Sequence, residues 1–257
     1  MAQHGLFDLQ DKVVLITGAA GGIGAALSRA YAQAGATLVL TDLAGEKLDA
    51  LASELRESGV KTGSYALHVE DRAACAAVVD EAVAAFGGVD VLVNCAGVNT
   101  RMRPEQYAED VWDRIIDINL KGSFNMCQAV HASMQARGKG KIINIGSILA
   151  LASNAMTAAY SASKGGVLQL TRSLACAWAA DGITVNVIQP GWIDTALSRQ
   201  ARVDIPGHAE RVVATTPMRR WGEPEDLVGP ALFLASAASD FMTGSSVVVD
   251  GGVTAHI

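Results

Sequence analysis

A tyrosine and a lysine four positions apart, Tyr160 and Lys164, are the residues whose types and spacing most suggest chemistry. If their segment is helical, the phenol hydroxyl and the ammonium lie on one face of the helix and can reach a shared partner. A phenol with an ordinary pKa near ~10 is a poor acid or base at neutral pH, but a fixed cation beside it favours the ionised form. Ser147 ends an apolar stretch upstream and could direct its hydroxyl at the same point. The same pair also occurs on helices where the Tyr is half-buried and the Lys reaches solvent, so the surrounding elements decide between the two interpretations.

A glycine-rich turn links the apolar residues 12–16 to a stretch with helical periodicity that stops at Gly35. Its glycines, Gly18, Gly22 and Gly24, do not match the G-x-G-x-x-G pattern. They nevertheless allow the backbone to turn tightly and to approach a pyrophosphate at the N-terminus of the following helix. The turn therefore predicts a dinucleotide-binding site.

Asp42 closes the second apolar stretch, residues 37–41, about 20 residues after the glycine turn, where an acidic residue commonly hydrogen-bonds the adenine ribose. A carboxylate at this point would repel a 2′-phosphate. Neither residues 19–21 nor Leu43 supplies a compensating cation. We therefore predict NAD as the cofactor in preference to NADP.

Apolar stretches alternate with helical periodicity along the whole chain. The expected strands are residues 12–16, 37–41, 63–69, 89–93, 141–147, 183–188 and 246–249, and the expected helices are 22–34, 46–58, 71–86, 110–136, 157–180 and 225–235. Seven strands alternating with six helices predict an α/β fold with one doubly wound, parallel, Rossmann-type sheet covered by helices on both faces.

The domain organisation follows from the same pattern. No change of composition divides the chain, so residues 1–257 are predicted to form a single dinucleotide-binding and catalytic domain. Residues 191–222 lack clear periodicity, and long irregular segments of this kind often cover ligands. We therefore expect an irregular substrate lid at about 191–222.

The composition excludes several classes of function. Half of the residues are hydrophobic, 18% are charged and the formal net charge is -6, so a disordered chain and a basic surface for nucleic acid or an anionic membrane are excluded. No apolar run is long enough to cross a bilayer, and residues 1–12 lack the apolar core of a signal peptide, so a soluble cytoplasmic protein is expected. The four cysteines are dispersed and expected to be reduced. Cys127 and His131 stand four apart without a second such pair, so no metal site is predicted.

Several motifs, in their order along the chain, resemble the short-chain dehydrogenase/reductase family. They are TGAAGGIG at 17–24, the run Asn94-Cys95-Ala96-Gly97, Asn119, Ser147, Tyr160 with Lys164, and PGWIDT at 190–195. The resemblance covers nearly the whole chain and implies a catalytic tetrad of Asn119, Ser147, Tyr160 and Lys164. In the family, the tyrosine exchanges a proton with the substrate oxygen and the serine hydrogen-bonds that oxygen. The lysine holds the nicotinamide ribose and lowers the pKa of the tyrosine, and the asparagine keeps a proton-relay water in place.

The resemblance also implies a homotetramer and a set of cofactor-binding residues. That set is Gly18, Gly22, Ile23, Gly24, Asp42, Leu43, Val69, Asn94, Ala96, Gly97, Tyr160, Lys164, Pro190, Gly191, Ile193 and Thr195. Two positions depart from the family pattern: His68 stands where an Asp near the adenine is common, and Cys95 stands where the family has a second Asn. We expect the adenine contact to involve backbone alone and Cys95 to affect packing.

The substrate is the least determined feature. Residues 141–147, 214–227, 239–241 and 249–252 resemble sugar-acid and polyol dehydrogenases of the gluconate 5-dehydrogenase type, although much of 214–227 is shared with 3-oxoacyl-thioester reductases, which typically use NADPH. Asp42 therefore favours NAD-linked oxidation of a secondary alcohol to a ketone. The alternatives are a 3-oxoacyl-thioester reductase, a cyclic-alcohol dehydrogenase and, outside enzymes, a silent dinucleotide-binding regulatory subunit. The predicted substrate residues are Arg101 and Arg103, as bidentate partners of a carboxylate, with Leu149, Asn154 and Trp192.

Overall fold

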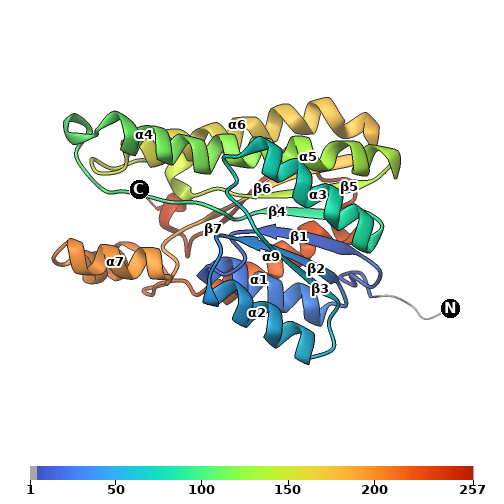
Figure 1. The fold of residues 1–257 in the computed structure, drawn as a ribbon. Helices are drawn as coiled ribbons and strands as arrows, with labels where there is room; N and C mark the ends of the chain where they lie inside the picture. Colours follow the sequence, from blue (N-terminus) through green and yellow to red (C-terminus); the bar gives the residue numbers. More distant parts are fainter. Residues whose placement is uncertain (1–4, 257) are drawn as a thin grey trace.

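Seven parallel strands form one twisted sheet in the computed structural model, which describes residues 5–256 apart from the side chains of Leu197, Gln200 and Asp204 (Figure 1). The strands are β1 Val13–Thr17, β2 Thr37–Asp42, β3 Thr62–Ala66, β4 Val91–Asn94, β5 Gly140–Ile145, β6 Ile183–Pro190 and β7 Ser246–Val249. Their order is β3-β2-β1-β4-β5-β6-β7, and every neighbouring pair is parallel. The predicted doubly wound sheet is therefore confirmed.

Helices cover both faces of the sheet (Figure 1). They are α1 Gly22–Gln33, α2 Glu46–Glu57, α3 Arg72–Phe86, α4 Glu109–Ile116, α5 Gly122–Ala136, α6 Ala158–Trp178, α7 Ala196–Asp204, α8 His208–Thr215 and α9 Val228–Ala235. The core is split in two by the sheet because side chains alternate along each strand: Val14 and Ile16 pack with α1, α2 and α9, whereas Leu15 packs with α3 and α5. Strands buried on both faces explain the continuous apolar runs of the sequence.

The strand order reverses between β1 and β4, the two strands at the centre of the sheet. Helices after β1 and β4 lie on opposite faces, so their connections diverge and leave a crevice at the carboxyl ends of the strands. Ligands of doubly wound sheets bind at such a point. The candidate site is therefore expected at the ends of β1, β4, β5 and β6.

Several predicted boundaries differ from the structure by two residues or more, and two of the differences affect the site. The third strand ends at Ala66 and not at residue 69, although the backbone N–H of Leu67 still donates to Asp42 over 2.8 Å. The single helix expected at 110–136 is α4 and α5 joined by a π-helical turn at Asp117–Lys121, which holds Asn119. The widened turn inserts one extra residue without breaking the helical rod, so the hydrophobic periodicity does not reveal it.

The segment expected to be irregular, 191–222, contains α7 and α8, so the described chain has nine α-helices where six were predicted. Helix α7 has nine residues, most of them polar, so its sequence offers too few turns and too few apolar residues for a periodic signal. Its N-terminus is defined instead by a capping box, in which Thr195 and Ser198 each bond the other's backbone N–H.

Backbone pairing ties the two ends of this segment together. Ile193 and Gly222 form a parallel bridge, the N–H of Asp194 donates to Gly222 over 2.7 Å, and the N–H of Gly222 donates to Trp192 over 2.9 Å. The chain thus leaves the body after β6 and returns to the same place, carrying α7 and α8 as an outlying unit (Figure 1, orange). No helix within residues 5–256 has the length and apolar character needed to cross a membrane.

Candidate active site

Two adjoining cavities open at the carboxyl ends of the central strands. The glycine groove, about 410 Å³, is lined by the turn after β1, by Asp42 and by residues following β3 and β4. The tyrosine pocket, about 150 Å³, is lined by Ser147, Tyr160 and Lys164. Both cavities are lined by four shared residues, so they form one continuous site: Ile23, Cys95, Gly97 and Thr195.

The glycine turn can be built only without side chains at two positions. Gly18 has φ +64°, and a Cβ there would lie 2.8 Å from the backbone of Ala96. A Cβ on Gly24 would collide with the carbonyl oxygen of Gly18. Helix α1 then begins without a side-chain cap and without an acidic residue in its first turn. Uncapped N–H groups and the positive end of the helix dipole at this wall suit a pyrophosphate, so the turn fits the predicted dinucleotide.

Asp42 lies at the end of β2 on the groove wall. Its two carboxylate oxygens accept hydrogen bonds from Ala20 N over 2.8 Å and from Leu43 N over 2.7 Å. These bonds tie the carboxylate to the glycine turn, in the place where an adenine ribose would lie. A shallow pocket next to the groove contains Asp42 together with Lys47, which follows at the start of α2.

Lys164 is buried and anchored. Its Nζ donates to the carbonyl oxygen of Ile145, at the end of β5, over 2.8 Å, and lies 5.7 Å from the centre of the Tyr160 ring. Burial lowers the pKa of Lys164 to about 8, because the charged form loses hydration. The lysine is thus held beside the aromatic ring and the groove by a bond to the sheet.

The ionisation of Tyr160 depends on its burial and on neighbouring groups. Burial raises its pKa above the ordinary value, while a hydrogen bond with Ser147 and the charge of Arg101 oppose that rise. The ammonium of Lys164 lies 5.7 Å from the centre of the Tyr160 ring. The lowering of the Tyr160 pKa by Lys164 stays a prediction.

Ser147 follows β5 in an extended conformation. Its Oγ accepts from Leu149 N over 3.1 Å, and its backbone N–H donates to Oε1 of Gln189 over 2.6 Å. Gln189 is fully buried near the end of β6, and its side chain leaves no space for a Cβ on Gly146. The sequence prediction missed Gln189. Its signal was a long polar side chain at the end of an apolar strand, next to Pro190.

Asn119 lies fully buried in the π-helical turn. Its side chain accepts from Val98 N over 2.8 Å and donates to Val98 O over 2.9 Å and to Ser163 Oγ over 3.0 Å. The amide therefore ties the loop after β4 to helix α6. Gly97 lines both cavities, and a Cβ on it would lie 3.3 Å from Asn119 Oδ1 and 3.6 Å from Lys164 Nζ. Asn119 is therefore close to the shared wall, although it lines neither cavity.

Asn94, predicted to contact the cofactor, has its side chain in the framework. Its Nδ2 donates to Asn144 Oδ1 over 2.9 Å and lies 3.3 Å from Cys127 Sγ. Asn144 in turn donates to Thr171 on α6. Asn94 lines neither cavity, so we correct its assignment to a residue that joins β4 and β5 to the helices packed on them.

The other predicted cofactor residues divide between the two cavities. The groove is lined by Gly18, Gly22, Ile23, Gly24, Asp42, Leu43, Val69, Ala96, Gly97 and Thr195. The pocket is lined by Ile23, Gly97, Tyr160, Lys164, Pro190, Gly191, Ile193 and Thr195. These residues come from six separate stretches of sequence, and the topology of the sheet brings them together.

The predicted substrate residues are only partly brought together. Arg101, Leu149 and Trp192 line the tyrosine pocket. Arg103 is exposed and paired with Glu105, and Asn154 is exposed and accepts from Met156 N over 2.9 Å. Both local pairings hold their side chains outside the pocket, so the prediction is wrong for Arg103 and Asn154.

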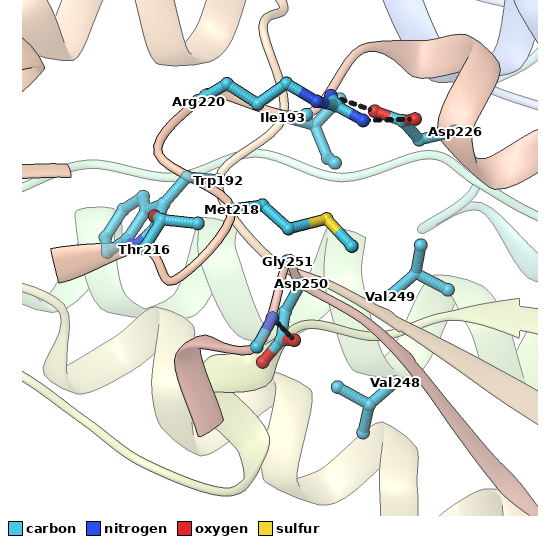
Figure 2. Close-up of a pocket in the computed structure, with 12 residues that line it drawn as sticks. Trp192, Ile193, Thr216, Met218, Arg220, Asp226, Val248, Val249, Asp250 and Gly251 are labelled. Atoms are coloured by element: carbon cyan, nitrogen blue, oxygen red, sulfur yellow. Dashed lines mark hydrogen bonds and ion pairs between the residues drawn. The ribbon is translucent and has the colours of Figure 1, made fainter. Parts of the chain in front are cut away.

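Trp192 and Ile193 line both the tyrosine pocket and a second cavity of about 350 Å³, which is shown in Figure 2. In this second cavity the charged side chains of Arg220, Asp226 and Asp250 already have partners. Arg220 makes two hydrogen bonds with Asp226, of 2.6 and 2.8 Å, and Asp250 accepts from Gly252 N over 2.8 Å. The side chains that could perform chemistry are therefore on the tyrosine side of Trp192.

Comparisons with known proteins place both the sequence and the structure among dehydrogenases and reductases of one family. The family profile described as enoyl-(acyl carrier protein) reductase matches residues 18–254. The chain is 38% identical to the 3-oxoacyl-(acyl-carrier-protein) reductase of Thermotoga maritima, over 95% of this chain and 98% of that protein. It is also 38% identical to the 2-dehydro-3-deoxy-D-gluconate 5-dehydrogenase of Pseudoalteromonas atlantica, over 96% and 97% of the two chains.

Among solved structures, the chain is similar to a gluconate 5-dehydrogenase from Burkholderia cenocepacia in complex with NADP and tartrate. The two share 40% sequence identity and superpose with a TM-score of 0.94, over 99% of each chain. The similarity thus includes the sheet, the helices on both faces and the segment that carries α7 and α8.

Proposed function

Because the chain belongs to the short-chain dehydrogenase/reductase family of nicotinamide-dependent oxidoreductases, we propose that it interconverts a secondary alcohol and a ketone by hydride transfer with NAD. The proposed substrate is a sugar acid, a polyol or a related small hydroxy compound. The observation that carries the proposal is the convergence of Ser147, Tyr160 and Lys164 on a pocket continuous with the glycine groove. Two relatives named as dehydrogenases of gluconate and of a deoxygluconate derivative support the substrate class.

The cofactor proposal depends on the charge of Asp42. Its carboxylate is fixed by two backbone N–H groups on the wall where the adenine ribose would lie, and it would repel a 2′-phosphate. The competing candidate is NADP, which is bound in the Burkholderia structure. Lys47, beside Asp42, could attract a 2′-phosphate, so both dinucleotides must be compared directly.

In the proposed reaction, each residue of the pocket has one task. When bound, the nicotinamide supplies the acceptor or donor of hydride. During oxidation, Tyr160 takes the proton of the substrate hydroxyl, and Ser147 donates a hydrogen bond to the same oxygen. During reduction, Tyr160 returns the proton to the oxygen of the developing alcohol.

Lys164 and Asn119 are proposed to organise the site. The anchored ammonium of Lys164 lines the tyrosine pocket, where it can hydrogen-bond ribose hydroxyls of the nicotinamide end. The π-helical turn around Asn119 alters the backbone bonding of the helix, and such turns occur frequently at functional sites. We propose that this turn holds the proton-relay water, while the Asn119 side chain stabilises the loop after β4.

Three alternative functions were considered beside this proposal. The Thermotoga relative favours a 3-oxoacyl-thioester reductase, whose substrate carries a long thioester arm, and a cyclic-alcohol dehydrogenase would require a largely apolar pocket. Arg101 and Trp192 on the pocket wall suit a small polar acid better than either. A silent regulatory subunit is disfavoured because Ser147, Tyr160 and Lys164 are all present in one pocket.

The proposal is tested with purified protein, NAD or NADP, and a panel of sugar acids, polyols, cyclic alcohols and hydroxyacyl thioesters, by following the absorbance of the reduced cofactor. We expect turnover of a sugar acid or polyol with NAD, and a loss of roughly 10²-fold or more in Tyr160→Phe with cofactor binding retained. Turnover of thioesters alone would reject the proposed substrate class. No turnover with any compound of the panel would reject the proposal that the protein is an enzyme of this kind. Homotetrameric assembly and a cytoplasmic location remain predictions, the former measurable by sedimentation.

A further inference from the structure

His208, the first residue of α8, is a buried polar side chain that the proposed chemistry has not used. Its imidazole is 3% exposed and meets two indole rings edge to face, Trp192 at 5.3 Å and Trp221 at 5.7 Å between ring centres. Nδ1 lies 3.1 Å from Nη2 of Arg211, which can only donate. The neutral ring therefore carries its proton on Nε2.

The Nε2–H group of His208 has no hydrogen-bond partner among residues 5–256. A buried donor without a partner costs free energy, roughly 1–3 kcal/mol, and such groups in native proteins call for an explanation. An acceptor brought in by a ligand would remove this cost. The imidazole is consequently prepared to recognise an oxygen atom.

The charges around His208 indicate which kind of oxygen. Burial lowers the pKa of His208, and each charge that lowers it further is a guanidinium: Arg211, Arg101 and Arg202. Arg202 stacks on Trp221, 3.9 Å from the ring centre, and is 3.2 Å from Asp194. A neutral donor surrounded by guanidinium groups favours an anionic acceptor over a neutral one.

The cluster is connected to the tyrosine pocket by Arg101 and Trp192, which both line that pocket. The charge of Arg101 lowers the pKa of Tyr160 as well as that of His208, so this guanidinium is near enough to act on both residues. Trp192 meets the His208 ring edge to face and also lines the second cavity, which has a volume of about 350 Å³ (Figure 2). Contact between His208 and a ligand in the tyrosine pocket would require the indole to move aside.

We propose that His208 and Arg101 form a carboxylate-recognition site, which makes His208 a residue that selects acidic over neutral substrates. The inference rests on the proposed function, since it assigns the far end of that substrate. One carboxylate oxygen accepts from Nε2–H of His208 and the carboxylate pairs with the guanidinium of Arg101, while the hydroxyl to be oxidised lies at Tyr160.

The test measures binding and turnover separately. Calorimetry on protein saturated with reduced cofactor gives the Kd of gluconate, of tartrate and of sorbitol, the neutral polyol that matches gluconate in length. We expect the wild type to bind the two acids more tightly than sorbitol. His208→Phe, which keeps a ring and removes the donor, should weaken acid binding roughly 10- to 100-fold, and His208→Gln, which keeps an N–H, should weaken it less. Arg101→Gln should weaken it as well, whereas Arg103→Gln is the matched control outside the pocket.

Three results would overturn the inference. The first is equal affinity of the wild type for the acids and for sorbitol. The second is equal weakening of acids and sorbitol in His208→Phe, which would indicate that the ring only packs against Trp192. The third is weaker binding of the reduced cofactor itself in His208→Phe. If His208→Phe does not fold, as judged by its melting curve, His208→Gln and Arg101→Gln give the same comparison. Failure of the proposed function is recognised separately, by absence of turnover with every alcohol in the panel.

Discussion

The side-chain oxygen of Gln189 accepts a hydrogen bond from the backbone N–H of Ser147 over 2.6 Å, and this bond joins the ends of β5 and β6 at the tyrosine pocket. Both residues are buried, and the Gln189 side chain occupies the space beside Gly146 where a Cβ would otherwise lie. The Ser147 N–H lies beyond the end of β5 at Ile145, so the bond to Gln189 provides the acceptor that a neighbouring strand would otherwise supply. It also determines where the Ser147 hydroxyl stands relative to Tyr160.

Replacing Gln189 with Met should therefore lower kcat by roughly 10-fold or more, with little change in cofactor affinity, because a misplaced Ser147 affects the reacting oxygen and not the groove. Gln189→Glu, which retains an acceptor, should recover part of the rate. Steady-state kinetics and cofactor titration measure both quantities. An unchanged kcat in Gln189→Met would show that Gln189 does not position Ser147.

The pH dependence of oxidation should respond to Arg101. The charge of Arg101 lowers the pKa of Tyr160, so its removal in Arg101→Gln raises that pKa. The proton-accepting phenolate then forms only at higher pH, and the rising limb of kcat against pH moves to higher pH. Arg103→Gln is the control, since Arg103 is exposed and paired with Glu105. Identical profiles for the wild type and Arg101→Gln would contradict the electrostatic coupling.

Cofactor preference should depend on Asp42. Asp42→Asn keeps the length of the side chain and removes the charge that would repel a 2′-phosphate, so the ratio of kcat/KM for NAD to that for NADP should fall roughly 10-fold. Lys47→Ala should change the same ratio in the opposite direction if Lys47 attracts the phosphate. A ratio unaffected by Asp42→Asn would show that another part of the groove discriminates.

Asn94 should matter for stability and not for cofactor binding. Asn94→Ala removes the donor to Asn144 and leaves a buried acceptor unpaired, which should cost about 1–3 kcal/mol in the free energy of unfolding. Denaturant unfolding measures this change, and titration with NADH measures cofactor affinity, which we expect to be preserved. Loss of cofactor affinity in a folded Asn94→Ala would restore the original assignment.

The glycine turn should not tolerate a methyl group at Gly24. In Gly24→Ala the new Cβ meets the Gly18 carbonyl and lies 2.9 Å from Ala19, so the turn must open and the cofactor Kd should rise roughly 10-fold or more. Gly229→Ala in α9 is the matched control, because nothing lies within 4 Å of its Cβ position. That variant should bind cofactor normally and be slightly more stable. Equal cofactor affinities of Gly24→Ala and Gly229→Ala would mean that the glycine turn can adjust to a methyl group.

The sequence by itself determined the parallel doubly wound fold, the family, and the regions that meet at the site. These features could be predicted because they are local. The periodicity of strands and helices, the glycine turn and the Tyr160–Lys164 spacing each involve residues that are close together in the sequence. The prediction failed where the local signal was weak. Helix α7 is short and mostly polar, and the π-helical turn at Asp117–Lys121 does not interrupt the periodicity of the helix around it.

Only the tertiary structure decided what each polar side chain faces. Asn94 was assigned to the groove from its motif, yet its amide bonds Asn144, fifty residues along the chain. Lys164 was expected beside Tyr160, and the structure adds that its ammonium donates to the carbonyl oxygen of Ile145. Gln189 gave only a weak local signal and His208 gave none, because their roles come from partners on other elements and from burial. Desolvation and hydrogen bonding across the sheet depend on which distant segments pack together, and no spacing within one segment specifies that.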